Sequence, residues 1–225
     1  MRQLRLGAHP VALLLVFLGG PDIAEGASIL TFEATQRGWI RDDGMDNGTD
    51  PTNNYLAGRI AWPGIEYRNF FVFEPLFRGL VTAATLVLDT RVFTSPDPTE
   101  TYQVTSLGAT FGFADLGTGT FYGSRVFSSA DLYGIVRIPL NASAIFAITS
   151  GQPFRLGGRV TTISANAAST EQVFAGSGGR NSESQTRLEL TVENTVIPEP
   201  SSWALAGLGL AALGLLGRRR RAGSR

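Results

Sequence analysis

The sequence predicts an all-β protein, a jelly-roll-like antiparallel β-sandwich of roughly eight to ten strands with one short helix. Runs rich in β-branched and aromatic residues recur along the chain, and Gly, Pro, Asn and Asp separate them. No repeated helical pattern lies between these runs. The run Thr82–Val92 alternates cleanly, with Leu86 and Leu88 on one face and Thr85 and Val87 on the other.

Strands are expected, in chain order, at residues 29–40 with a break near Arg37, 67–73, 82–92, 101–107, 120–127, 134–140, 154–163, 171–174 and 186–193. Residues 41–54 are polar and predict a long loop, and Ser95-Pro96-Asp97-Pro98 has the composition of a turn. One segment interrupts the pattern of strands. Residues 141–149 are typical of a short helix, with Asn141 as its N-cap.

The first residues of the chain have the layout of a secretory signal peptide. Two arginines precede the apolar run Val11–Leu18, and small residues follow it up to a cleavage point after Gly26. Residues 1–26 are therefore set apart as a signal peptide. The folded body is expected at residues 27–197, which form one domain of about 170 residues, enough for a single core.

The composition excludes several kinds of chemistry. The chain has no cysteine, and therefore no disulfide and no thiolate nucleophile. It has no lysine, which excludes Schiff-base and P-loop lysine chemistry. Its single histidine, His9, lies in the signal peptide, so the body has no imidazole for a Ser-His-Asp relay or a zinc site. We interpret the protein as a non-enzyme.

The charge of the body differs from that of the whole chain, whose formal net charge is zero. Residues 27–197 hold 16 Asp or Glu and 12 Arg, a net charge of −4. Nucleic-acid binders need a basic patch, so no nucleic-acid partner is expected. A weakly acidic exported domain suits hard cations or neutral sugars better.

The last 28 residues, 198–225, have a pattern of their own. Pro198-Glu199-Pro200 begins it, and its prolines bar a helix from continuing back into the body. Residues 203–217 carry no charge, and four consecutive arginines follow, Arg218, Arg219, Arg220 and Arg221. Such a basic block is typical of the cytoplasmic side of a membrane.

The apolar run is short for a membrane span. Fifteen helical residues reach about 22 Å, whereas the hydrocarbon core is about 30 Å thick. The segment therefore predicts a C-terminal transmembrane helix that serves as a sorting signal. An ordinary, permanent C-terminal anchor is the alternative.

This tail resembles the PEP-CTERM sorting signal of Gram-negative bacteria, in its Pro198-Glu199-Pro200 motif, its apolar helix and its arginine cluster. The resemblance implies recognition by an exosortase, a membrane transpeptidase that cuts near the Pro-Glu-Pro. It also implies transit through the inner membrane and delivery to the cell surface or to the exopolysaccharide matrix of a biofilm. The same segment is also called the ice-binding protein C-terminal domain, a label that describes the tail and is no evidence of ice binding.

The body resembles a recurring, uncharacterised β-domain of exported bacterial proteins. Asn53–Gly58, Tyr67–Phe73 and Asp115–Thr120 are among the segments that carry this resemblance. It implies a β fold and no particular reaction.

The loop at residues 41–54 is the first candidate site. It contains the carboxylates of Asp42, Asp43, Asp46 and Asp50, whose oxygens are the ligands that Ca²⁺ takes. The EF-hand order is not met, and Asp, Asn and Gly are also common in exposed turns. A calcium site and a solvated loop are therefore both open.

Aromatic residues flank this loop and are the second candidate site. Exposed aromatic rings stack on sugars through their apolar faces, and the candidates for this role are Trp39, Trp62 and Tyr55. Packing in the core is the alternative for each ring. Glycoside cleavage would need two carboxylates roughly 5 to 10 Å apart. The acidic residues considered for it are scattered along the chain, at Glu33, Glu66, Glu74, Asp89 and Glu100.

The sequence therefore predicts an exported, non-enzymatic surface or matrix protein that an exosortase sorts, with exopolysaccharide or another glycan as a candidate partner. Three alternatives stay open. They are a permanently anchored periplasmic domain, a glycan-active enzyme that uses carboxylates, and a structural matrix component that binds no sugar.

Overall fold

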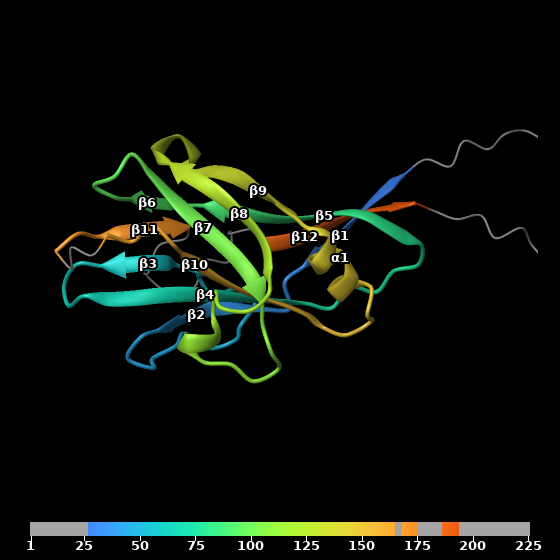
Figure 1. Cartoon of the computed structure of the whole chain (residues 1–225), viewed down its shortest axis with the longest axis horizontal. Coiled ribbons are helices and arrows are strands. Elements are labelled where there is room, and N and C mark those ends of the chain that lie inside the picture. Colours follow the sequence, from blue (N-terminus) through green and yellow to red (C-terminus); the bar gives the residue numbers. More distant parts are fainter. Residues whose placement is uncertain (1–26, 165–167, 175–185, 194–225) are drawn as a thin grey trace, which may run out of the picture.

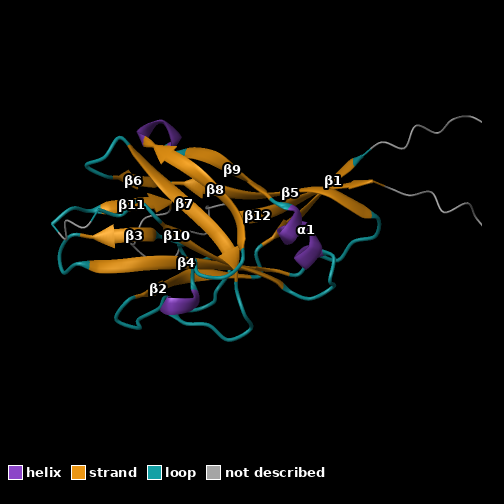
Figure 2. Ribbon diagram, in the orientation of Figure 1, coloured by secondary structure: helices purple, strands orange, loops and turns teal. Residues whose placement is uncertain are grey.

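The computed structural model describes residues 27–164, 168–174 and 186–193. These residues form two antiparallel sheets that face each other (Figures 1 and 2). The smaller sheet contains, in spatial order, β1 (Ser28–Glu33), β12 (Thr186–Glu193), β5 (Leu80–Thr90) and β9 (Gly134–Leu140).

The larger sheet contains, in spatial order, β6 (Val92–Thr94), β11 (Glu171–Phe174), β3 (Ala57–Ile60), β4 (Ile65–Phe73), β10 (Phe154–Val160), β7 (Thr99–Ser106) and β8 (Phe121–Ser128). A further strand, β2 (Gln36–Arg41), pairs with β4 outside this path. Two short 3-10 turns, Phe113–Asp115 and Ser129–Asp131, and the helix α1 (Ala142–Ile148) complete the described elements.

Eight of these strands have the jelly-roll order. Counted from 1 to 8 along the chain, β1, β4, β5, β7, β8, β9, β10 and β12 give 1-8-3-6 in the smaller sheet and 2-7-4-5 in the larger. The predicted jelly-roll-like sandwich is confirmed. The described residues hold twelve strands rather than eight to ten, because β3 and β6 have only four and three residues and show no alternation to detect.

The core lies between the two sheets. Leu86 and Leu88 of β5 are fully buried and belong to the same core cluster as aromatic side chains from the larger sheet. Val87, which the alternation places on the other face of β5, is fully buried as well. The Phe174 ring is central in the core cluster, with its centroid 4.6 Å from that of Tyr102 and 5.1 Å from that of Phe127. Such edge-on contacts stabilise a core beyond the area that they bury.

The predicted helix is confirmed as α1, and Asn141 is its N-cap. The Asn141 side chain accepts a hydrogen bond from the Ala144 amide at 3.1 Å. Ala144 and Ile148 are its buried residues, and the helix packs on β5 and β8. No helix in the described ranges combines the length and the apolar composition that crossing a bilayer requires.

The two ends of the described body lie together. Strands β1 and β12 pair along their whole length, with Ser28 opposite Val192 (Figure 1). The predicted signal peptide at residues 1–26 and the predicted sorting segment at residues 198–225 lie outside the described residues.

Candidate functional site

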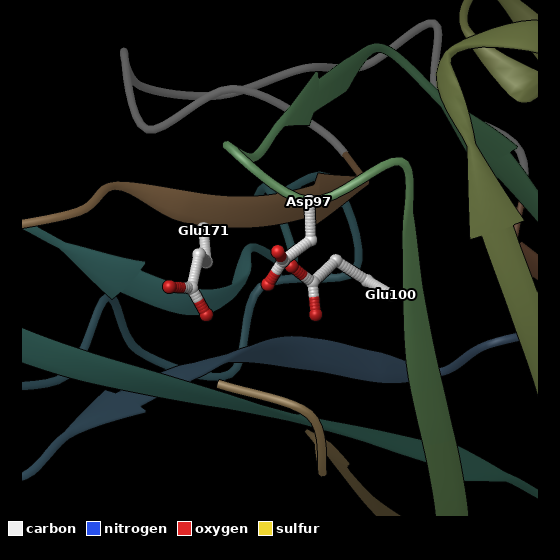
Figure 3. A group of neighbouring side chains, drawn as sticks. All are labelled: Asp97, Glu100 and Glu171. Carbon is white, nitrogen blue, oxygen red and sulfur yellow. The ribbon is translucent and has the colours of Figure 1, made fainter. Parts of the chain in front are cut away.

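Three acidic side chains converge at the end of the sandwich opposite the chain termini. Asp97 lies in the turn between β6 and β7, Glu100 is the second residue of β7, and Glu171 begins β11. Within the described ranges, they are the one group of three acidic residues whose carboxylate oxygens lie within 4.8 Å of one another. Figure 3 shows the three side chains near one another, with Glu171 on β11, Asp97 on the turn before β7 and Glu100 on β7.

A close backbone approach sets the position of Glu171. Gly58 in β3 has φ +122°, and a Cβ built on it would lie 1.9 Å from the Glu171 carbonyl oxygen. Only glycine leaves room for β11 to pair so closely at this point. The two strands pair with Glu171 opposite Arg59.

Both glutamates are fully buried, whereas Asp97 is exposed. The Ser95 hydroxyl donates a hydrogen bond to Glu100 Oε1 at 2.5 Å, and the Thr162 hydroxyl donates to Oε2. The Asp97 amide in turn donates to Ser95 Oγ at 2.9 Å. The turn between β6 and β7 is therefore tied to the first residues of β7.

Glu171 fixes the segment that follows β10. The Ser164 amide donates to Glu171 Oε2 at 2.7 Å, and the Ser164 hydroxyl donates to Oε1 at 2.5 Å. The Arg59 guanidinium donates to the Ser164 carbonyl oxygen. Each of the four oxygens of Glu100 and Glu171 thus accepts a hydrogen bond, which offsets much of the cost of burying them.

The chemistry of this group is that of oxygen ligands. Three carboxylates with serine and threonine hydroxyls beside them are the donors that a hard cation such as Ca²⁺ takes. The group suits glycoside cleavage poorly, because that reaction needs two carboxylates that reach a substrate. Glu100 and Glu171 are closed to solvent and held by protein donors.

The four aspartates proposed as calcium ligands, Asp42, Asp43, Asp46 and Asp50, do not form such a group. The carboxylates of Asp43, Asp46 and Asp50 accept hydrogen bonds within their own turns. Asp46 Oδ1 accepts from the Gly48 amide at 2.8 Å, Asp50 Oδ1 accepts from the Thr52 amide at 2.8 Å, and Asp43 accepts from the Met45 amide and from Arg41. The amide of Met45 and the charge of Arg41 lower the pKa of Asp43. A calcium site in this loop therefore stays a prediction, and it would need ligands other than a cluster of these four carboxylates.

The proposal of Tyr55 as a sugar-stacking residue is wrong. Its side chain is fully buried, and its ring packs on Phe71 and Phe174. Its hydroxyl donates to the Asp89 carbonyl oxygen at 2.8 Å and accepts from the Asp89 amide at 3.0 Å. Burial raises the pKa of Tyr55 to about 12. The ring packs in the core between the two sheets, and neither of its faces is accessible to a ligand.

The two tryptophans differ in what they offer. Trp39 is half-buried, lies edge-on to Tyr67 at 5.0 Å between ring centroids, and donates from Nε1 to Asn54 Oδ1 at 2.6 Å. Trp62, in the turn between β3 and β4, is 87% exposed. Stacking on sugar stays a prediction for both, and Trp62 has the more accessible ring.

A pocket that the sequence does not indicate lies beside α1. It has a volume of about 410 Å³, and its lining residues come from the start of β8 and from α1: Thr120, Tyr122, Ala142, Ser143, Phe146 and Ala147. The two lining segments are about twenty residues apart in the chain, and neither has a motif that indicates a pocket.

Comparison with protein families identifies the tail. Residues 196–221 match the family model described as the PEP-CTERM protein-sorting motif. This chain carries a PEP-CTERM sorting motif. The match confirms the resemblance drawn from Pro198-Glu199-Pro200 and the arginine cluster, Arg218 to Arg221. The PEP-CTERM motif implies an exported protein of a Gram-negative bacterium, in transit through the membrane, with an exosortase as its processing partner. The match concerns the tail alone. It does not support the resemblance of the body to an uncharacterised exported β-domain, nor the ice-binding label.

Among solved structures, the body is similar to a cleaved adhesin domain of Lys-gingipain from Porphyromonas gingivalis. The identity is 10%, the match covers 74% of this chain and 99% of that chain, and the TM-score is 0.33. A likeness at this TM-score carries no argument about function. No curated protein matches the sequence.

Proposed function

We propose that this protein is a non-enzymatic component of the cell surface or the exopolysaccharide matrix, delivered by its PEP-CTERM motif. The motif at residues 196–221 carries the proposal. An exosortase cuts near Pro198-Glu199-Pro200, and the jelly-roll body is the part that reaches the outside. The body is a β-sandwich without cysteine or lysine, a composition that suits a structural or binding role.

The absence of catalysis is part of this proposal. The body has no histidine and no cysteine, and its convergent glutamates, Glu100 and Glu171, are buried and hydrogen-bonded to protein donors. A glycosidase would need an acid and a base or nucleophile in contact with the substrate. These observations favour a binding or structural role over a glycan-active enzyme.

A glycan is the partner that we propose for the released body. The supporting observation is the Trp62 ring, which is 87% exposed at a turn. Large aromatic side chains with an accessible apolar face are suited to stacking on sugar rings. The net charge of −4 on residues 27–197 favours neutral rather than acidic polysaccharide.

The sorting step is tested by intact mass measurement of the surface form. We expect the released protein to lack residues 203–225, and we expect replacement of Pro198-Glu199-Pro200 by three alanines to leave full-length protein in the membrane. A released form that still carries Trp203 to Arg225 would overturn the exosortase route and would favour the permanent anchor.

The glycan step is tested by pull-down on exopolysaccharide from the producing strain. Trp62→Ala is expected to lower retention, and Trp39→Ala serves as the matched tryptophan variant with a less accessible ring. Equal retention of wild type and Trp62→Ala would exclude stacking at this turn. Failure of the wild type to bind any polysaccharide would favour the structural matrix component.

A further inference from the structure

One end of the sandwich is tied to the PEP-CTERM tail by a short stretch of chain. Glu193 ends β12 and lies opposite Leu80, the first residue of β5, while Ser28 of β1 lies opposite Val192. The loop at residues 74–79 enters β5 at the same place. A Cβ built on Gly79 would meet Val192 Cγ1 at 2.6 Å. We call this region the tether end: residues 74–80, the start of β1, the end of β12, and α1.

The helix α1 belongs to the tether end because its following loop adjoins residues 74–76. Glu74, Pro75 and Leu76 line a pocket together with Gly151, Gln152 and Pro153, which come just after α1. In Figure 1, α1 and the turn from β4 into β5 lie on the side of the molecule where β1 and β12 run to the chain ends. Four segments distant in sequence therefore share one end.

Apolar side chains stand out into solvent at the tether end. Leu76 is 89% exposed, Phe146 of α1 is 80% exposed, and Ile29 and Leu80 are 68% and 56% exposed. Such exposure leaves apolar area in water without a folding benefit. Several such side chains around one end are typical of a surface that meets another phase or partner.

The loop at residues 74–80 has the composition of a membrane-interface contact. Phe77 packs inward, with its ring centroid 6.5 Å from that of Phe32. Leu76, Arg78 and Leu80 on either side of it are exposed. Leucine in the acyl boundary with arginine at the headgroup level is a favourable pairing at a lipid surface, especially an anionic one.

The length of chain between body and tail brings this end to the bilayer. Ten residue steps separate Glu193 from Trp203, the start of the apolar run. Fully extended, they span at most about 35 Å, roughly the length of one 11-residue strand such as β5. So short a link raises the effective concentration of the body at the membrane to the millimolar range, where weak contacts are populated.

We propose that the tether end docks on the lipid surface of the membrane while the uncleaved protein is held there by its C-terminal segment. Leu76, Leu80 and Phe146 enter the interface, and Arg78 contacts anionic headgroups. This rests on the proposed function, in that the PEP-CTERM tail must insert before it is cut. Exposed apolar side chains occur elsewhere too, among them Trp62 and Tyr133, but those lie in turns at the opposite end of the sandwich, about one strand length farther from the start of the tail.

Lipid-borne quenching of a site-specific fluorophore tests this docking. The chain has no cysteine, so Leu76→Cys and Trp62→Cys each give one labelling position, and the two native side chains are similarly exposed at 89% and 87%. The labelled full-length chain is reconstituted into vesicles of phosphatidylethanolamine and phosphatidylglycerol that contain a quencher-bearing lipid. We expect quenching about threefold or more stronger at position 76 than at position 62, with a blue shift only at 76.

Two controls are needed. One distinguishes contact of the side chains with lipid from closeness that the tail alone imposes, and the other detects a tail that has not inserted. Adding Leu80→Asp and Phe146→Asp to Leu76→Cys leaves the tether intact, so a drop in quenching shows that the apolar side chains make the contact. Equal quenching at positions 76 and 62 in protein that floats with vesicles overturns the docking and leaves the sorting route standing. Protein that does not float with vesicles overturns tail insertion itself, and the proposed route with it.

Discussion

The two ends of the sandwich place polar and apolar side chains in opposite ways. We call the end with Asp97, Glu100 and Glu171 the carboxylate end. There Glu100 and Glu171 are buried, and each accepts hydrogen bonds from protein donors. The carboxylate end is therefore stabilised by internal polar contacts, although the rings of Trp62 and Tyr133 are exposed there too. At the tether end four aliphatic or aromatic side chains, Ile29, Leu76, Leu80 and Phe146, are exposed. This contrast supports the proposed contact of the tether end with the lipid surface.

The largest expected effect comes from the close pairing that supports the carboxylate end. Gly58→Ala would place Cβ 1.9 Å from the Glu171 carbonyl oxygen at φ +122°, so we expect a loss of at least about 3 kcal/mol in unfolding free energy by urea denaturation. Gly44→Ala is the matched control, because φ is +88° there and nothing lies within 4 Å of the added Cβ. It should cost only about 1 kcal/mol. Similar losses in both variants would mean that β3 and β11 can separate without harm.

The aromatic core beneath the carboxylate end predicts an alkaline transition. The pKa of Tyr55 is raised to about 12 from its ordinary value of 10.0. The folded state therefore keeps its proton when the unfolded chain has lost it, and the stability this gives is present below pH 10 and lost between pH 10 and 12. A shift of this size corresponds to roughly 2 to 3 kcal/mol. Urea unfolding at several pH values should show a shallower decline for Tyr55→Phe, and an unchanged decline would contradict the assignment.

The next largest loss of unfolding free energy should come from Glu171→Ala. It leaves the Ser164 amide and hydroxyl without their acceptor, and we expect a loss of about 2 kcal/mol in thermal or urea unfolding. Glu171→Gln keeps one carbonyl oxygen as an acceptor for the amide and should cost less. The idea that these hydrogen bonds hold the carboxylate end fails if the alanine variant is as stable as the wild type.

The smallest effect should come from the tether end. Phe146→Ser removes an exposed ring, so unfolding free energy should change by less than about 0.5 kcal/mol. Ile148→Ala, two residues along the same helix and 1% exposed in the native protein, should cost about 2 kcal/mol or more. If Phe146→Ser destabilised the protein as much as Ile148→Ala, the ring would serve folding and the contrast between the two ends would disappear.

Local patterns predicted the parts of the fold that local physics decides. The strands β9, β11 and β12 begin and end at the predicted residues, because alternation and flanking breakers define them. Asn141 caps α1 as expected. The short strands β3 and β6 escaped prediction, because both are too short to show a pattern and both pair with β11, which is distant in the chain. Strand β3 also pairs with its sequence neighbour β4.

The candidate sites were harder to predict, because burial and convergence are tertiary properties. Tyr55 looked like a loop residue beside polar neighbours, yet it lies between the sheets. In the loop at residues 41–54, the carboxylates of Asp46 and Asp50 accept hydrogen bonds from backbone amides of the same loop. The carboxylates that do converge come from Asp97, Glu100 and Glu171, which no single stretch of sequence brings together.

The sequence by itself determined the β class, the helix cap, the absence of thiol and imidazole chemistry in the body, and the PEP-CTERM motif at residues 196–221. Each of these depends on neighbouring residues or on composition. Only the tertiary structure decided that Glu100 and Glu171 are buried together and that Leu76 and Phe146 are left in water at the end nearest the tail. The physical reason is that antiparallel pairing joins residues far apart in the chain, as β1 and β12 do, and burial follows from those pairings.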